Sequence, residues 1–164
     1  MMKIRIAGTV NDSVVDGPGI RYTVFFQGCH HNCFGCHNPQ THSVDGGYEI
    51  NTDEIINEIK NNPLLDGITL SGGEPLLQVE GASELARVCK ENGLNVICYT
   101  GFTYEKIFGI KNIDLLLPYV DYLIDGKFEN DLRDLSLKYR GSKNQRIIDV
   151  QKSLKQESVV IIEM

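Results

Sequence analysis

Three cysteines within eight residues constrain this chain more than any other feature of its sequence. Cys29, Cys33 and Cys36 have the spacing C-x3-C-x2-C, so one short loop supplies three thiols. A chain of 164 residues can bury enough core to fold without disulfides or a structural metal, so the cluster predicts a metal site that serves chemistry. Cys89 and Cys98 lie in apolar helix and strand patterns, and we expect both to be core residues.

Three thiols leave one coordination position open. Structural zinc sites are closed by four protein ligands, and electron-transfer 4Fe-4S clusters take four thiolates, so three thiolates alone favour a site with one position free for substrate. A zinc site of three cysteines and one histidine stays an alternative at this point. The histidines near the loop are His30, His31, His37 and His42, each of which is otherwise a solvated loop residue.

The net charge of -6 narrows the classes of partner. Nucleic acids and anionic membranes require a basic surface that this composition lacks, so we expect no nucleic-acid and no membrane partner. No segment has the roughly 18 consecutive apolar residues of a membrane span, and the sequence starts without the apolar region of a signal peptide. We therefore expect a cytoplasmic protein whose partner is another protein or a small molecule.

Alternation of apolar runs and helical patterns predicts an α/β fold. A helix capped by Asn51 or Thr52 precedes the strand GITLS, and a helix over about 78–92 precedes the strand NVICYT. A helical stretch over about 104–117 then leads to the strand YLIDG. The chain is too short for a full eight-stranded barrel, so we expect an open or partial (β/α) barrel forming a single domain over 1–164.

The two ends of the chain give weaker patterns. KIRIAGTV and RYTVFFQG are candidates for extra antiparallel strands at the N-terminal edge. RIIDV and SVVIIEM are candidates for closing strands, and DLRDLSLKY reads as a short helix or an extended loop.

Four unusual segments each follow an apolar run: QGCHHNCFGC, SGGEP, YTG and DGK. In parallel α/β folds the ligand site lies beyond the carboxyl ends of the strands, so these segments are expected to meet at one rim.

The combination of the cysteine loop with SGGEP after the next strand resembles the radical S-adenosylmethionine superfamily. DGPGIR at 16–21, FFQGC and the Cys-His-Asn-Pro run at 36–39 are similar to the activating enzymes of glycyl radical enzymes. Within that group, the short chain and the C-x3-C-x-G-C form resemble the branch that activates the anaerobic ribonucleotide reductase.

The resemblance implies one 4Fe-4S cluster held by Cys29, Cys33 and Cys36, with S-adenosyl-L-methionine as the second cofactor. Reductive cleavage would give a 5'-deoxyadenosyl radical that attacks a backbone glycine of the large reductase subunit, with reduced flavodoxin or ferredoxin as electron donor. The residues expected to bind S-adenosylmethionine are Gly35, Cys36, His37, Gly72, Gly73, Glu74, Asp125 and Lys127.

Three of these residues have assigned roles. Lys127 is expected near the methionine carboxylate, and Asp125 as an acceptor for the ribose or a nearby cation. Glu74 would orient the glycine turn or accept from the methionine ammonium, while its alternative is a helix-start charge.

One departure from the superfamily pattern concerns the position before the last cysteine, where many members carry an aromatic residue. This sequence has Gly35 there and Phe34 one place earlier, so Phe34 either stacks on adenine or packs under the loop. Two other functions stay open: an activase for a formate-lyase type enzyme, and a non-catalytic Cys/His zinc-binding module.

Overall fold

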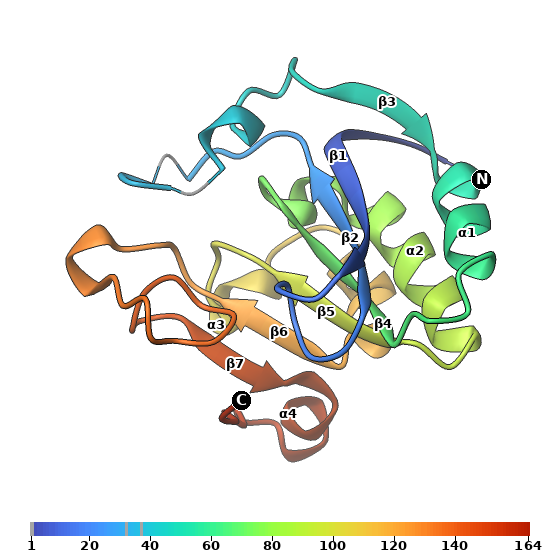
Figure 1. Ribbon diagram of the computed structural model, residues 1–164. Coiled ribbons are helices and arrows are strands. Elements are labelled where there is room, and N and C mark those ends of the chain that lie inside the picture. Colours follow the sequence, from blue (N-terminus) through green and yellow to red (C-terminus); the bar gives the residue numbers. More distant parts are fainter. Residues whose placement is uncertain (1, 32, 37) are drawn as a thin grey trace.

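The computed structural model describes residues 2–31, 33–36 and 38–164. Within them, seven strands form one curved sheet in the order β3-β1-β2-β4-β5-β6-β7, and helices α1 and α2 cover one of its faces (Figure 1). The strands are β1 (Lys3–Ser13), β2 (Arg21–Phe26), β3 (Tyr48–Asn51), β4 (Gly67–Gly72), β5 (Asn95–Tyr99), β6 (Tyr122–Asp125) and β7 (Arg146–Asp149). The α-helices are α1 (Thr52–Lys60), α2 (Val79–Glu91), α3 (Tyr104–Ile107) and α4 (Val150–Gln156).

The centre of the sheet is parallel. β2, β4, β5 and β6 run side by side in one direction, with β1 antiparallel to β2 and β7 antiparallel to β6. The sheet ends in two different strands, β3 and β7, and is therefore open, as expected for a partial barrel. The prediction for RYTVFFQG was wrong in one respect: its strand β2 is the first parallel strand, because its six residues pair in register with β4.

Helix α1 begins where the sequence predicts. The Asn51 side chain accepts a hydrogen bond from the Asp53 N–H, and the Glu54 side chain accepts from the Asn51 N–H, which satisfies donors that the first helical turn leaves free. Ile55, Ile56 and Ile59 then point into the core from one face.

Alternation along β5 separates two apolar clusters. Val96 and Cys98 face the helices and join the main core, whereas Ile97 and Tyr99 face the opposite side of the sheet. Ile97 packs there with Ile124 and with partly buried residues of the C-terminal segment. Cys89 and Cys98 are both buried, as predicted.

The stretch 104–117 is not one helix. It contains the single turn α3 followed by 3-10 turns at Ile113–Leu115 and Leu117–Tyr119. Asn112, directly before the first 3-10 turn, takes a left-handed φ of 66°, which a continuous helix does not contain.

RIIDV forms β7 as predicted, but SVVIIEM contributes only an isolated bridge from Ile161 to Ile148. DLRDLSLKY is loop apart from the end of a 3-10 turn at Asn130–Leu132 and an isolated bridge from Arg133 to Ser142. None of the helices in the described part of the chain has the length and apolar composition of a membrane span.

Candidate functional site

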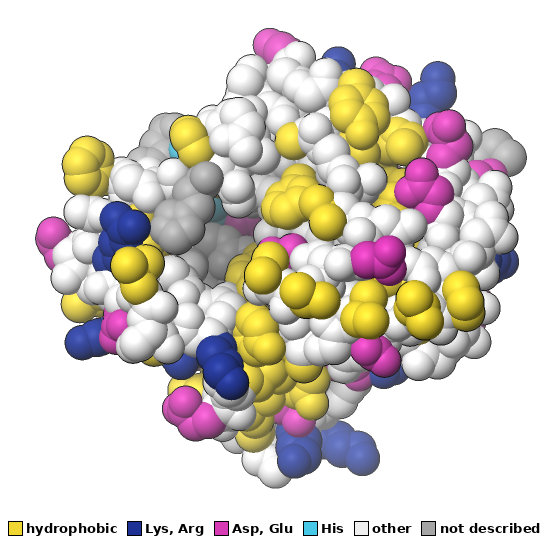
Figure 2. Space-filling model, in the orientation of Figure 1, with side chains coloured by type: hydrophobic (Ala, Val, Ile, Leu, Met, Phe, Trp, Pro, Cys, Tyr) yellow, Lys and Arg dark blue, Asp and Glu magenta, His cyan; other side chains and the backbone are white. Residues whose placement is uncertain are grey.

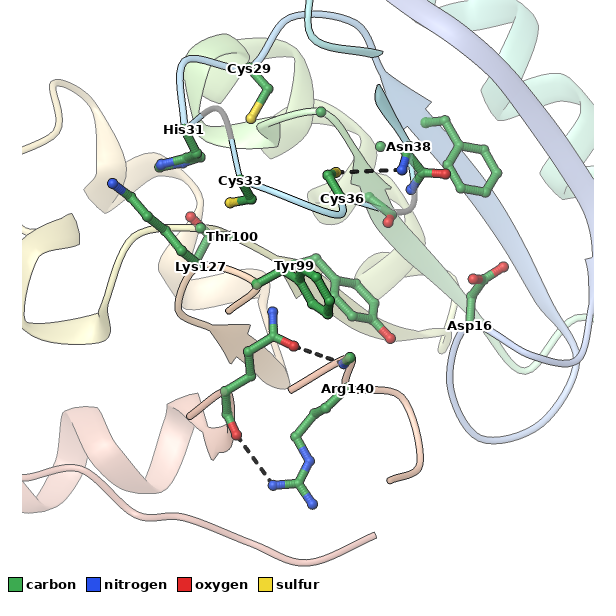
Figure 3. Close-up of a pocket in the computed structure, with 18 of the residues that line it drawn as sticks. Asp16, Cys29, His31, Cys33, Cys36, Asn38, Tyr99, Thr100, Lys127 and Arg140 are labelled. Carbon is green, nitrogen blue, oxygen red and sulfur yellow. Dashed lines mark hydrogen bonds between the residues drawn. The ribbon is translucent and has the colours of Figure 1, made fainter. Parts of the chain in front are cut away.

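The four rim segments meet at one cavity of about 540 Å³, as the sequence predicts (Figure 3). The loop after β2 contributes all three clustered cysteines, and the end of β4 contributes Gly72 and Gly73. Residues 99–101 after β5 and 126–128 after β6 complete this part of the wall. In Figure 2, the face of the molecule that carries these loops is hollowed.

Backbone hydrogen bonds fix both ends of the cysteine loop. The Gly28 N–H donates to the Thr41 carbonyl at 2.6 Å, and the Cys29 N–H donates to the His42 carbonyl at 3.0 Å. These bonds tie the entry of the loop to the segment that leaves it. The loop is therefore a closed structure that presents its sulfurs to the cavity.

Each of the three sulfurs accepts a backbone N–H. Cys29 accepts from His31, Cys33 accepts from Phe128, and Cys36 accepts from Asn38 at 3.4 Å. Hydrogen bonds of this kind stabilise a thiolate and tune the potential of an iron-sulfur cluster. The half-buried sulfurs thus carry donors suited to ligating thiolates.

The same environment opposes ionisation of the free thiols. Burial raises the pKa of both Cys29 and Cys33 above the usual value, and backbone N–H donors partly offset the rise. The Lys127 ammonium also lowers the pKa of Cys33. Figure 3 shows the Lys127 side chain extending toward the end of the cavity where the cysteine loop lies.

These observations fit a thiolate-bound cluster. Three sulfurs on one cavity wall, each with an N–H donor, would hold it, and the glycine-lined wall beside them leaves room for a second group. Among the described residues, no group of three His, Cys, Asp or Glu side chains is arranged to hold a single metal ion.

The positions of the two glycines in SGGEP leave no room for a side chain. Gly72 has a φ of 100°, and a Cβ there would lie 2.4 Å from the Phe26 nitrogen. A Cβ on Gly73 would lie 2.4 Å from the Gly28 carbonyl oxygen. Both glycines line the cavity. Gly72 also allows the end of β4 to approach the end of β2, and Gly73 allows it to approach the start of the cysteine loop.

Glu74 does not line the cavity. Its side chain is 1% exposed and accepts from the His31 ring, Thr100 and the Gly101 N–H, so the structure gives it protein partners in place of a cofactor ammonium. It also accepts from the Leu76 N–H, which is the helix-start role named as its alternative.

Asp125 is likewise turned away from the cavity. Its carboxylate accepts from Arg146 and from the Tyr104 N–H, and it is 1% exposed. The hydrogen bonds that the Arg146 guanidinium donates to Asp125 and Glu105 raise the pKa of Arg146, so this is a stable ion pair behind the rim.

The expectations for four residues of the cysteine loop have different outcomes. Gly35 is not among the cavity-lining residues, and a Cβ there would meet the Asn130 side chain at 2.9 Å. Phe34 is 81% exposed, which contradicts the alternative that it packs under the loop. His37 lies outside the described residues, while His31, for which a solvated loop position was one alternative, is largely enclosed, with a side chain 8% exposed.

Sequence reasoning missed several lining residues, including Asp16, Asn38, Tyr99 and Arg140 (Figure 3). Asp16 accepts from the hydroxyls of Ser13 and Thr23, which holds its carboxylate at the wall. The signal was present in the sequence, because Asp16 opens the DGPGIR segment and Tyr99 opens the YTG segment.

A family model described as a 4Fe-4S single cluster domain matches residues 15–148. An anaerobic ribonucleoside-triphosphate reductase-activating protein of Haemophilus influenzae is 38% identical over 144 residues, which are 82% of this chain and 90% of the relative. A pyruvate formate-lyase-activating enzyme of Clostridium pasteurianum is 38% identical over 138 residues, which are 79% of this chain but only 57% of the relative.

Among solved structures, QueE from Escherichia coli superposes with a TM-score of 0.52 at 15% identity. The likeness covers 63% of this chain and 55% of that chain, and it supports the fold alone.

Proposed function

The chain belongs to the radical S-adenosylmethionine family of 4Fe-4S enzymes that activate glycyl radical enzymes, and from this premise we propose that it generates a glycyl radical on an anaerobic ribonucleoside-triphosphate reductase. The observation that carries the proposal is the meeting of three N–H-supported thiols with the glycine segment in one cavity.

The choice of reductase over lyase rests on how much of each relative the chain covers. This chain covers 90% of the Haemophilus influenzae reductase activator but 57% of the Clostridium pasteurianum lyase activator, at equal identity. The lyase activator has segments without a counterpart here. We propose that residues 1–164 form a single radical S-adenosylmethionine domain, because the seven strands of the described residues pair in one sheet.

The residues that line the cavity have different proposed roles, according to where they lie. Cys29, Cys33 and Cys36 would hold the cluster, which supplies, when bound, the electron for cleavage of S-adenosylmethionine and hence the oxidant for the partner's glycine. Gly72 and Gly73 keep the wall beside the sulfurs free of side chains. Lys127, at the mouth of the same wall, offers a positive charge for the methionine carboxylate.

The substrate glycine must reach the cavity within a protein segment. The cavity opens on one face of the molecule, so a flexible segment of the large reductase subunit can enter it (Figure 2). We assign the electron supply to a reduced flavodoxin or ferredoxin. We place the protein in the cytoplasm, where free thiols such as these stay reduced.

Electron paramagnetic resonance tests the assignment directly. The anaerobically reconstituted protein is mixed with reductant, S-adenosylmethionine and either the reductase or a pyruvate formate-lyase. A glycyl doublet is expected with the reductase and absent with the lyase. Cys33→Ala serves as the matched control and gives no signal with either. A doublet with the lyase alone would move the assignment to the lyase activators.

A further inference from the structure

His31 lies between the first two cysteines, yet its ring is held by residues from other rim segments. Its Nε2 lies 2.6 Å from Glu74 Oε1, and the two side chains are 8% and 1% exposed. A carboxylate only accepts hydrogen bonds, so the contact assigns the ring proton to Nε2.

Glu74 is itself fixed from several sides. Thr100 Oγ1 lies 3.0 and 2.9 Å from its two oxygens, and the Gly101 N–H donates to Oε1 at 2.8 Å. The carboxylate therefore joins the end of β4 to the end of β5. Because these partners occupy both oxygens, His31 contacts a rigid acceptor.

The His31 ring also packs against residues that follow β5. It contacts Phe102 edge-on, with ring centroids 4.7 Å apart and an interplanar angle of 74°. A Cβ on Gly101 would lie 2.5 Å from the His31 ring, so the glycine is what permits this approach. A hydrogen bond and two packing contacts thus hold one side chain of the cysteine loop.

The backbone of His31 serves the cluster site. Its N–H donates to the Cys29 sulfur, so a clamp on the ring also fixes the position of that donor. Hydrogen bonds to ligating sulfurs stabilise the reduced cluster, which carries the larger negative charge, and so raise the reduction potential of the cluster.

We propose that His31 is a positioning residue, which through Glu74 sets the cysteine loop against the ends of β4 and β5 and thereby sets the potential and the cofactor-facing geometry of the cluster. The proposal rests on the cofactors of the proposed function but not on its protein partner.

The test compares His31→Ala with His31→Gln, whose side-chain amide can donate near the Nε2 position. His30→Ala is the matched control, since His30 is the exposed neighbour in the same loop. Iron content, cluster midpoint potential, equilibrium affinity for S-adenosylmethionine and partner-free cleavage with a chemical reductant are measured. A failed partner assignment leaves all four readouts intact.

His31→Ala is expected to shift the potential to a more negative value and to weaken S-adenosylmethionine binding about tenfold, in line with the loss of one charge-assisted hydrogen bond. His31→Gln should recover at least half of both shifts, and His30→Ala should match the wild type. If His31→Ala loses iron, recovery of iron by His31→Gln supports the clamp. Wild-type potential and affinity in His31→Ala, or a His31→Gln variant no better than His31→Ala, would overturn it.

Discussion

The backbone N–H of Glu74 donates a 2.7 Å hydrogen bond to the carbonyl oxygen of Gly28, the residue immediately before the first cysteine. The glycine segment after β4 and the cysteine loop after β2 therefore share a backbone contact, and we expect a change in one to shift the other.

Gly73→Val tests this contact. The new Cβ would lie 2.4 Å from the Gly28 carbonyl oxygen and 2.9 Å from that of Thr41, so the cysteine loop must shift. We expect a loss of about 1–3 kcal/mol of stability and a reduced iron content. The measurements are thermal unfolding of the cluster-free protein and iron per chain after reconstitution.

The control for this prediction is Gly8→Ala, because a Cβ on Gly8 meets nothing within 4 Å. Wild-type iron content in Gly73→Val would show that the loop does not depend on this approach and that the glycine serves the cofactor alone.

The elements that sequence predicts well are those decided locally. GITLS, NVICY and YLID are short apolar runs between breakers, and Asn51 with Glu54 forms a capping pair three residues apart. Strand β3 and helix α4 were not predicted. The strand has four residues, and the helix runs on directly from β7 with Asp149 as its cap.

Some features of the site can also be predicted from the sequence, and others cannot. The cysteine loop and Lys127 each follow a strand, and the topology of a parallel sheet brings the carboxyl ends of its strands to one rim. The partners of Glu74 and Asp125 could not be predicted, since His31 and Arg146 lie 43 and 21 residues away along the chain. From the sequence alone, a carboxylate that follows a strand is predicted to bind a ligand. Whether it is buried and paired with another side chain can be seen only in the structure.

Asp125→Asn separates an ion-pair role from a cofactor role. Asp125 accepts from Arg146 at 3.1 and 2.5 Å and from the Tyr104 N–H at 2.8 Å. We expect the variant to lose about 2 kcal/mol of stability, a figure reduced because Arg146 is partly exposed. The KM for S-adenosylmethionine should change by less than about twofold, because the carboxylate lies off the cavity.

Glu105→Gln is the control for the pair, since Glu105 contacts the same Arg146 guanidinium from an exposed position. Its loss should stay below about 1 kcal/mol. A large rise in KM for Asp125→Asn, with stability unchanged, would mean that Asp125 binds S-adenosylmethionine after all.

Alkaline pH should destabilise the cluster-free protein through its buried thiols. Burial raises the pKa of Cys89 to about 12 from 9.0, so the folded state keeps a proton that the unfolded state releases. The stabilising contribution is fully present below pH 9 and is lost as the pH rises toward 12. Between those limits the slope from this thiol is about 1.4 kcal/mol per pH unit.

Cys89→Ala removes this titration. Denaturant unfolding at a series of pH values from 8 upward should show a shallower alkaline loss in the variant than in the wild type, whatever the packing cost at neutral pH. Parallel curves for the two proteins would mean that Cys89 ionises equally in both states.

Lys127→Met should weaken the binding of S-adenosylmethionine more than its cleavage. The ammonium is exposed at the cavity wall and close enough to Cys33 to lower the pKa of that thiol, which supports its proposed role beside the methionine carboxylate. An exposed charge contact of about 1 kcal/mol corresponds to a rise of about fivefold in KM, with kcat little changed because ground state and transition state lose the same contact. The effect should shrink at high ionic strength, since salt screens the wild-type contact.

Lys143→Met is the charge-matched control. Lys143 is an exposed lysine off the cavity, so its loss should leave KM unchanged. The measurement is steady-state cleavage kinetics at two salt concentrations. A fall in kcat at constant KM would mean that Lys127 acts in the transition state and not in substrate binding. Equal effects of the two substitutions would mean that Lys127 contributes only to the net charge of the surface.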